Sequence, residues 1–415
     1  MSFVPLSPIL TIMQKIFPPL IQALQALLIE IFVHGRQADK AIEYAFKHQK
    51  KWGARDRAFL AENTYEMVRW YRLIGFMIGK EYPELPQDAH HMIATWLWMK
   101  KYDLKEIQRV IPAFTTDGLE SRWQEAQSIR AVSQSIPSWL DEVGCKELGP
   151  AQWEVELQAM NQPAPVFIRL NSLKANVHDL IRSLAEQGIE ATPVEKVPGA
   201  LRLEERAQLF KTMAFQQGWF EVQDAGSQCI GQFVEAKPGM RIIDACAGAG
   251  GKSLQLATLM QNKGKIIALD VEGWKLQELK RRAKRQDIQT IETRLIDPKT
   301  LKRLKGSADR LLLDVPCSGL GVLRRNPDSK WKLSPEFLAE IKQTQASILQ
   351  EYSQMLKPGG KLIYATCSIL PSESEDQVKQ FLSQNSSFHL EAEYRTSPAR
   401  DGFDGFYMAK LVQNA

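Results

Sequence analysis

Apolar residues recur at helical spacing through the first third of the chain. Between 16 and 33, the apolar positions that share one helical face are Leu20, Leu24, Leu27, Leu28 and Ile31. The same spacing continues in ADKAIEYAFKHQ (38–49) and in DRAFLAENTYEMVRWYRLIGFMIG (56–79). We therefore expect an all-α domain over residues 1–140.

The pattern changes twice further along the chain. Short β-like runs such as VFIRLN flank a helical segment, VHDLIRSLAEQG (177–188), which predicts a small α+β module over 141–235. From there on, strand-like and helical segments alternate almost to the C-terminus. Such alternation is typical of a parallel sheet with helices on both faces. We therefore expect an α/β domain with a Rossmann-like sheet over 236–415.

The first strand of this domain runs into a glycine cluster, RIIDACAGAGGKS (241–253). One phosphate-binding pattern would need glycine at Cys246 and the other would need it at Ser253, so the ligand is expected to lack a pyrophosphate. Asp270 closes the second strand, where a carboxylate can hold a ribose diol. Asp297 closes the third strand, within reach of an adenine amino group. Each aspartate alone could be a loop cap, but the order of glycines and acids is that of S-adenosylmethionine-dependent methyltransferases.

We therefore expect S-adenosylmethionine as the cofactor. The residues expected to contact it are those of the loop and the acids at the strand ends. They are Ala245, Cys246, Ala247, Gly248, Gly250, Gly251, Lys252, Asp270, Asp297 and Asp314.

Two cysteines each follow an apolar run, Cys317 in LLLDVPCSG and Cys367 in YATCS. Carbon C5 of cytosine becomes nucleophilic only when a thiolate adds to C6, so a cytosine-5 methyltransferase needs a cysteine. A carboxyl group near N3 would stabilise the charge that develops, and Asp314 is placed for this role. A cation such as Lys252 would favour the thiolate, since a free thiol is largely protonated at neutral pH. These arguments leave open which cysteine attacks.

Residues 166–415 resemble the RsmB/NOP family of RNA cytosine-5 methyltransferases. The motifs that carry the resemblance are DACAGAGGKS, DVPCSGLGVLRRNPD (314–328) and YATCSILPSESE (364–375), with FIRLNSLK and DGFDGFYMAKL beside them. The resemblance implies that Cys367 attacks C6 and that Cys317 assists release of the product. It also implies that Asp314 and Lys252 contact the target base.

The chain departs from the family pattern in the glycine loop. Gly248 and Ala249 stand where the family usually has Ala-Pro. Without the proline, the loop has more conformational freedom. The contacts to the methionine part of the cofactor are therefore expected to differ in detail.

The helical region also carries a resemblance, because 37–71 is similar to the NusB-like RNA-binding domain of ribosomal members of the family. Basic residues cluster there around Trp52, and again at 280–285 and 324–332. One such cluster is common on a solvated face, but three predict phosphate contact. The target base must be unstacked, which favours a single-stranded or loop region of small-subunit ribosomal RNA. Transfer RNA is an alternative.

Composition narrows the class of protein further. The five cysteines contain no C-x-x-C pair, which argues against a zinc site and a disulfide framework, and free thiols fit a reducing compartment. No apolar run has membrane-spanning length, and the first lysine is Lys15, which does not suit a signal peptide. A formal charge of +5 is too small to imply nucleic acid by itself. We expect a cytoplasmic monomer without metal or membrane.

Two other functions are weaker alternatives. A DNA cytosine-5 methyltransferase would use Cys317 as the nucleophile, but such enzymes have no matching Thr-Cys pair. A non-catalytic RNA-binding assembly factor would not need Lys252, Asp314, Cys317 and Cys367 together. The stretch Met1–Pro19 has no counterpart that we can place.

Overall fold

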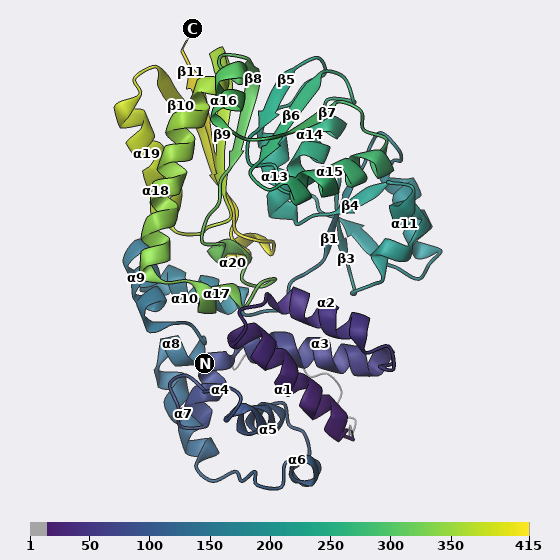
Figure 1. Ribbon diagram of the computed structural model, residues 1–415, viewed down its shortest axis with the longest axis vertical. Helices are drawn as coiled ribbons and strands as arrows, with labels where there is room; N and C mark the ends of the chain where they lie inside the picture. Colours follow the sequence, from purple (N-terminus) through teal and green to yellow (C-terminus); the bar gives the residue numbers. More distant parts are fainter. Residues whose placement is uncertain (1–14, 415) are drawn as a thin grey trace. The chain divides into compact units, whose positions relative to one another are not determined.

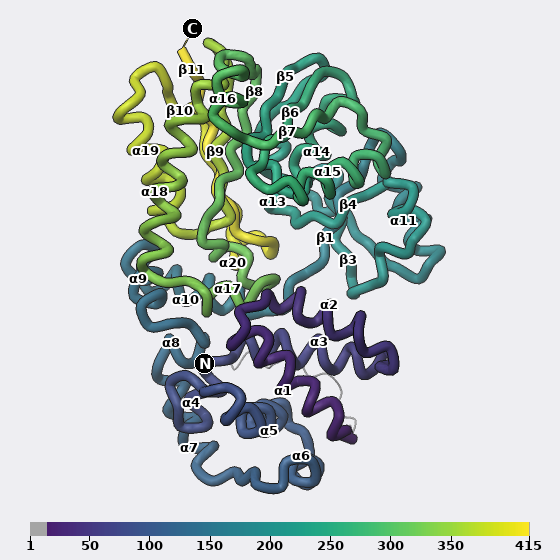
Figure 2. Tube along the Cα trace, viewed as in Figure 1, coloured from purple at the N-terminus to yellow at the C-terminus, as the bar shows by residue number. Residues whose placement is uncertain are grey.

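The computed structural model describes residues 15–414, so most of Met1–Pro19 lies outside the described residues. The chain forms two compact units. One comprises the residues up to Asn161 together with Arg325–Leu333, and the other comprises Gln162–Arg324 with Ser334–Ala415. Figure 2 traces the chain through both units. The second unit contains most of the predicted α+β module and the predicted α/β domain except Arg325–Leu333.

The first unit consists of helices (Figure 1), most of which share one apolar core. Its helices are α1 (Pro18–Phe32), α2 (Ala38–His48), α3 (Ala54–Arg69), α4 (Tyr71–Met77), α5 (Ala89–Met99), α6 (Leu104–Val110), α7 (Leu119–Ser128), α8 (Arg130–Ser133), α9 (Ser138–Leu148), α10 (Pro150–Met160) and α17 (Ser329–Lys332). Helix α1 buries the apolar face predicted for it. Trp96 of α5 is fully buried, and its indole N–H donates to Asn63 at 2.9 Å. Within residues 15–414, no helix is long and apolar enough to cross a membrane.

The segment Arg325–Leu333 follows the Cys317 motif in sequence but packs within the helical unit. The indole N–H of Trp331 donates to the carbonyl of Val68 at 2.7 Å, and its ring meets Tyr71 edge to face. Lys330 is 3% exposed, and burial lowers its pKa well below the ordinary value. This segment is therefore a structural part of the helical unit.

A small antiparallel sheet opens the second unit. Its strand order is β2-β3-β1-β4. The elements are β1 (Phe167–Leu170), α11 (Val177–Ala185), β2 (Ala191–Pro193), β3 (Ala200–Leu203), η1 (Leu209–Lys211), α12 (Met213–Gln216), β4 (Phe220–Val222) and α13 (Ala225–Phe233). Leu180 and Leu184 of α11 pack with Ile168 and Phe220 of the strands, which gives the sheet its own apolar core.

A sheet of seven strands in the order β10-β11-β9-β8-β5-β6-β7 forms the rest of this unit. Its strands are β5 (Arg241–Asp244), β6 (Lys265–Asp270), β7 (Ile291–Leu295), β8 (Ala308–Asp314), β9 (Leu356–Thr366), β10 (Phe388–Arg395) and β11 (Tyr407–Gln413). The five strands from β5 to β9 are parallel, and the last two are antiparallel to their neighbours. The predicted Rossmann-like sheet is confirmed.

Helices cover both faces of this sheet (Figure 1). On one face they are α14 (Gly251–Leu259) and α15 (Gly273–Gln286) beside α13, and on the other α16 (Pro298–Leu304), α18 (Pro335–Tyr352) and α19 (Glu375–Gln384). The connections contain the short helix α20 (Pro398–Asp401) and the turns η2 (Leu320–Val322), η3 (Ser353–Met355) and η4 (Pro371–Glu373). Neighbouring strand residues alternate between the faces: Ile242 packs with α13 to α15, while Ile243 packs with α16, α18 and α19. Both faces are thus apolar, as the continuous hydrophobic runs of the strands require.

Candidate active site

The order of the parallel strands determines where the site lies. Strand β5 has β6 on one side and β8 on the other, so the direction of winding changes at this point. Asp244, Asp270 and Asp314 are the last residues of β5, β6 and β8, and Cys367 directly follows β9. The carboxyl ends of parallel strands meet at one edge of a sheet, and ligands bind where the winding changes. The sequence-predicted residues therefore meet at the ligand-binding edge.

The glycine loop between β5 and α14 has a conformation that depends on glycine. Gly248 and Gly250 have φ values of +54° and +86°, which side chains disfavour. A Cβ atom at Gly250 would also lie 1.9 Å from Leu279 of α15. The loop can therefore pass close to α15 because Gly250 lacks a side chain, and both glycines allow its left-handed turns before helix α14 starts at Gly251.

Two carboxylates hold this loop. Asp270 accepts hydrogen bonds from the N–H groups of Gly248 and Glu272, both at 2.8 Å. Asp244 accepts one from the hydroxyl of Ser253 at 2.6 Å, but its other oxygen is buried without a partner among residues 15–414. Burial raises the pKa of Asp244 to about 6, against the lowering effect of Ser253. An ammonium group placed here would satisfy the free oxygen and favour the charged form.

A small cavity of about 90 Å³ opens beside the loop. Its lining residues are Gln223, Ser227, Asp244, Cys246, Ala247, Gly251, Lys252 and Asp314. The donors and acceptors fit S-adenosylmethionine: Asp244 offers an unpaired acceptor to the methionine ammonium, and each Asp270 oxygen has a second lone pair for a ribose hydroxyl.

Lys252 and Asp314 form an ion pair at the cavity wall. The lysine ammonium lies 2.6 Å from a carboxylate oxygen of Asp314, and both side chains are largely buried. Burial lowers the pKa of Lys252, but the charge and the hydrogen bond of Asp314, together with the nearby Cys367 and Asp244, outweigh this effect and raise the pKa above its ordinary value. The lysine is thus held protonated, as a donor beside an acceptor.

The two cysteines of the predicted motifs are in contact. Their Sγ atoms lie 3.2 Å apart, although the residues are far apart in sequence. The hydrogen bond with Cys367, burial and the nearby charge of Glu373 raise the pKa of Cys317 well above its usual range. Whereas a carboxylate lies near Cys317, the cation Lys252 lies close enough to Cys367 for their charges to interact. The two thiols therefore have different electrostatic surroundings.

A fully buried carboxylate, Glu373 of η4, connects the loops that carry the cysteines. It accepts hydrogen bonds from the N–H and hydroxyl of Ser318 at 2.8 and 2.5 Å, and from the hydroxyl of Ser368 at 2.5 Å. The amide group of Gln345 donates to Glu373 and to the carbonyl of Pro316, each at 3.0 Å. Since Ser318 and Ser368 directly follow the cysteines, Glu373 fixes the spacing of the two thiols.

The sequence motif already contained Glu373, but sequence reasoning gave this residue no role. An acidic residue six positions after the Thr-Cys cysteine lies in a polar, serine-rich stretch, where exposure is the ordinary expectation. Gln345, in the middle of α18, was missed for the same reason. The only feature of the sequence that could have identified Glu373 was its position within the second cysteine motif.

Two other residues that the sequence predicts as cofactor contacts, Asp297 and Cys246, are placed differently from the aspartates and Lys252 described above. Asp297 is exposed and caps helix α16, where it accepts a hydrogen bond from the N–H of Thr300 at 2.6 Å. This bond lowers its pKa. Cys246 lines the cavity, and burial raises its pKa well above the ordinary value, as expected of a packing residue. Asp297 is thus not among the cavity residues.

The expectation that all three basic clusters contact phosphate is wrong for several side chains. In the cluster at 280–285, Arg282 and Arg285 point inward to Glu221. In the cluster at 324–332, Arg324 and Lys330 are buried. In a helix, some residues of a basic run face solvent and others face the packed interior, and the sequence alone does not show which. Lys50, Lys51 and Arg55 of the first cluster are exposed.

Substituting Asp270 tests the cofactor site. Asp270→Asn should weaken binding of S-adenosylmethionine about tenfold, because a charge-assisted hydrogen bond contributes about 1.5–3 kcal/mol. Titration calorimetry measures the change. Asp297→Asn is the matched control, since asparagine also caps helices and the affinity should not change. Equal affinity for wild type and Asp270→Asn would remove Asp270 from the site.

The fold and the site together define an S-adenosylmethionine-dependent methyltransferase. Residues 232–412 match the family model described as 16S rRNA methyltransferase RsmB/F, and residues 136–209 match the model of the RsmF/B-like ferredoxin-like domain. A probable ribosomal RNA small subunit methyltransferase B of Synechocystis is 31% identical over 382 residues, which cover 83% of this chain and 84% of the relative. The chain therefore belongs to the RsmB/F family of methyltransferases, and its cofactor is S-adenosylmethionine.

Two further comparisons cover nearly the whole chain. The ribosomal RNA small subunit methyltransferase B of Vibrio vulnificus is 29% identical over 94% of this chain and 98% of its own length. The crystal structure of PH0851 matches with a TM-score of 0.80 and 27% identity, over 96% of this chain and 100% of that one. The similarity therefore extends beyond the catalytic sheet.

Proposed function

We propose that this protein methylates carbon C5 of a cytidine in small-subunit ribosomal RNA, through a covalent bond between Cys367 and C6. The observation that carries the proposal is the contact between the Cys317 and Cys367 thiols, 3.2 Å apart. The Lys252–Asp314 pair provides a donor and an acceptor at the same edge of the sheet. The names of the relatives support ribosomal RNA as the substrate.

The electrostatic surroundings support Cys367 as the attacking residue. The charge of Lys252 interacts with Cys367, and a nearby cation favours a thiolate. Cys317 lies near the Glu373 carboxylate, which disfavours a second negative charge. Of the two, Cys317 is therefore the thiol that retains its proton and donates it to the Cys367 sulfur.

These residues divide the reaction into two steps. The Cys367 thiolate forms a bond to C6, and the electron pair of the C5–C6 double bond becomes available at C5. Asp314 and Lys252 hold the base and stabilise the charge near N3. When bound, S-adenosylmethionine supplies an electrophilic methyl group to C5. The C5 proton is then lost to water, and its electron pair re-forms the C5–C6 double bond while the C6–sulfur bond breaks. The pair of that bond leaves on the Cys367 sulfur, and the protonated Cys317 thiol assists release by donating a hydrogen bond to it.

The substrate can be identified in vivo. Bisulfite sequencing of total RNA compares a strain that lacks the gene with its parent. The proposal predicts that one protected cytidine in small-subunit ribosomal RNA becomes convertible in the deletion strain. Loss of protection in a transfer RNA alone would identify that RNA as the substrate. Unchanged RNA together with altered DNA would support a DNA methyltransferase.

Exposed basic residues of the helical unit are the proposed RNA contacts. Lys50→Glu/Lys51→Glu should weaken RNA binding and lower the slope of log K against log salt, by about 0.7 for each lost contact to a single strand. Fluorescence anisotropy over a salt series measures both quantities. Lys101→Glu/Lys105→Glu, two exposed positions elsewhere in the unit, control for net charge. Identical slopes for the two variants would mean that this cluster does not contact phosphate.

A further inference from the structure

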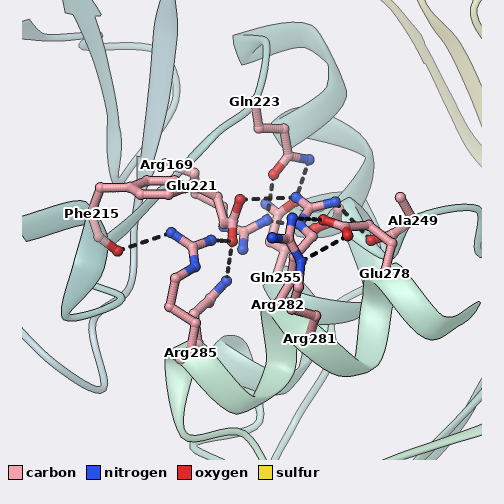
Figure 3. A network of polar contacts seen from close by, with 12 residues as sticks. Arg169, Phe215, Glu221, Gln223, Ala249, Gln255, Glu278, Arg281, Arg282 and Arg285 are labelled. Atoms are coloured by element: carbon pink, nitrogen blue, oxygen red, sulfur yellow. Dashed lines mark hydrogen bonds and ion pairs between the residues drawn. The ribbon is translucent and has the colours of Figure 1, made fainter. Parts of the chain in front are cut away.

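We infer that the small antiparallel sheet is part of the cofactor site, because Arg169 and Arg282 hold the carbonyl groups of the glycine loop. Both arginines lie outside the motif that forms the loop. The inference does not depend on the roles proposed for the two cysteines. It rests on the polar network shown in Figure 3.

Arg169 of β1 connects the small sheet to the start of helix α14. Arg169 is 4% exposed, and its Nη1 donates both to the carbonyl of Gly251 at 2.6 Å and to the side chain of Gln223. Burial lowers its pKa to about 9, so the group stays charged at neutral pH. The peptide plane that begins at Gly251 leads to Lys252, and a fixed carbonyl fixes that plane. Arg169 therefore orients the backbone that carries Lys252.

Arg282 of α15 holds the other side of the loop. Its guanidinium donates to the carbonyl of Ala249 at 2.7 Å and to the carboxylate of Glu221 at 2.9 Å. Glu221 belongs to β4 of the small sheet and also accepts hydrogen bonds from Arg285 and Gln286. Figure 3 shows these side chains meeting between the sheet and helix α15. Glu221 thus positions Arg282 against the loop.

The two bonds act where the loop most needs restraint. The carbonyls of Ala249 and Gly251 lie on either side of Gly250, and the loop lacks the proline usual in the family. A glycine-rich segment loses more conformational entropy than others when it is ordered. Two buried arginines that hold its carbonyls keep the loop in one conformation before the cofactor binds, which reduces the entropy cost of binding. Arg169 and Arg282 are therefore positioning residues.

If Arg282 only stabilised the fold, its loss would lower the melting temperature but leave cofactor affinity unchanged. Arg285 provides the matched control. Like Arg282, it lies on α15 and pairs with Glu221, but its other contacts are the carbonyl and ring of Phe215. Both Arg282→Gln and Arg285→Gln should lower the melting temperature. Only Arg282→Gln should also raise the dissociation constant of S-adenosylmethionine, by about tenfold.

The experiment uses the full chain and S-adenosylmethionine in titration calorimetry, with melting temperatures for each variant. Arg281→Gln controls for the loss of one arginine from α15 and should change neither quantity, because Arg281 is largely exposed and pairs with Glu278. Arg169→Gln, which removes the charged donor to the Gly251 carbonyl, should also weaken binding of S-adenosylmethionine and leave RNA affinity unchanged. If Arg282→Gln does not fold, Arg282→Lys takes its place. The same dissociation constant for Arg282 and Arg285 variants would overturn the inference.

Discussion

Replacing Cys367 by alanine is expected to abolish methyl transfer completely. Without a thiolate at C6, carbon C5 of the base never becomes nucleophilic, and no other group can replace the covalent step. The variant should still bind S-adenosylmethionine and RNA, because Asp244, Asp270 and Lys252 are unchanged. Transfer of a labelled methyl group to small-subunit ribosomal RNA measures the activity.

Cys229→Ala is the control for this substitution, because Cys229 is a partly buried cysteine that packs in the core of the same unit. Burial raises the pKa of its thiol to about 11, so it is expected to be inert. It should keep the wild-type rate. Residual transfer by Cys367→Ala at more than a small fraction of the wild-type rate would mean that another residue attacks the base.

Glu373→Gln is expected to lower the turnover number about a hundredfold. The amide has nearly the same shape as the carboxylate, but one acceptor oxygen becomes a donor that faces the groups of Ser318, Ser368 and Gln345. The cysteine loops must then move apart, and a displacement of about 1 Å at a reacting group can cost 10²-fold in rate. The KM for S-adenosylmethionine should not change, since no cofactor contact is lost. Steady-state kinetics with saturating RNA measure both constants.

Asp376→Asn is the matched control. Asp376 lies on the following helix, is exposed and pairs only weakly with Lys379 at 3.6 Å. Its turnover number should equal that of the wild type. A Glu373→Gln enzyme with an unchanged turnover number would show that the spacing of the two thiols does not depend on this carboxylate.

The sequence predicted much of the fold because the relevant signals are local. The alternation of strands and helices is a pattern of consecutive residues, and it identified the Rossmann-like sheet that the structure confirms. Asp244, Asp270 and Asp314 end parallel strands, and the carboxyl ends of such strands must meet. Their proximity could therefore be predicted without coordinates. The contact between Cys317 and Cys367 follows from the same geometry, since β8 and β9 are neighbours.

The remaining features depend on packing between distant segments, which no local pattern contains. Arg282 and Lys284 are both basic residues of α15. Arg282 faces Glu221 only because of the way this helix packs against the small sheet. Likewise, Trp331 packs in the helical unit although its neighbours in sequence, up to Arg324, belong to the catalytic unit. Glu373 could be recognised as a buried acceptor only after its donors on two other loops were known.

The central claim is that Cys367 attacks and Cys317 assists release, and one gel tests it. Wild type, Cys317→Ala and Cys367→Ala are incubated with S-adenosylmethionine and small-subunit ribosomal RNA, and are then separated under denaturing conditions. Cys317→Ala should add to C6 and accept the methyl group but stall before elimination, which leaves protein covalently joined to RNA as a slow band. Cys367→Ala should give no such band. A band from Cys367→Ala and none from Cys317→Ala would contradict the assignment of the nucleophile.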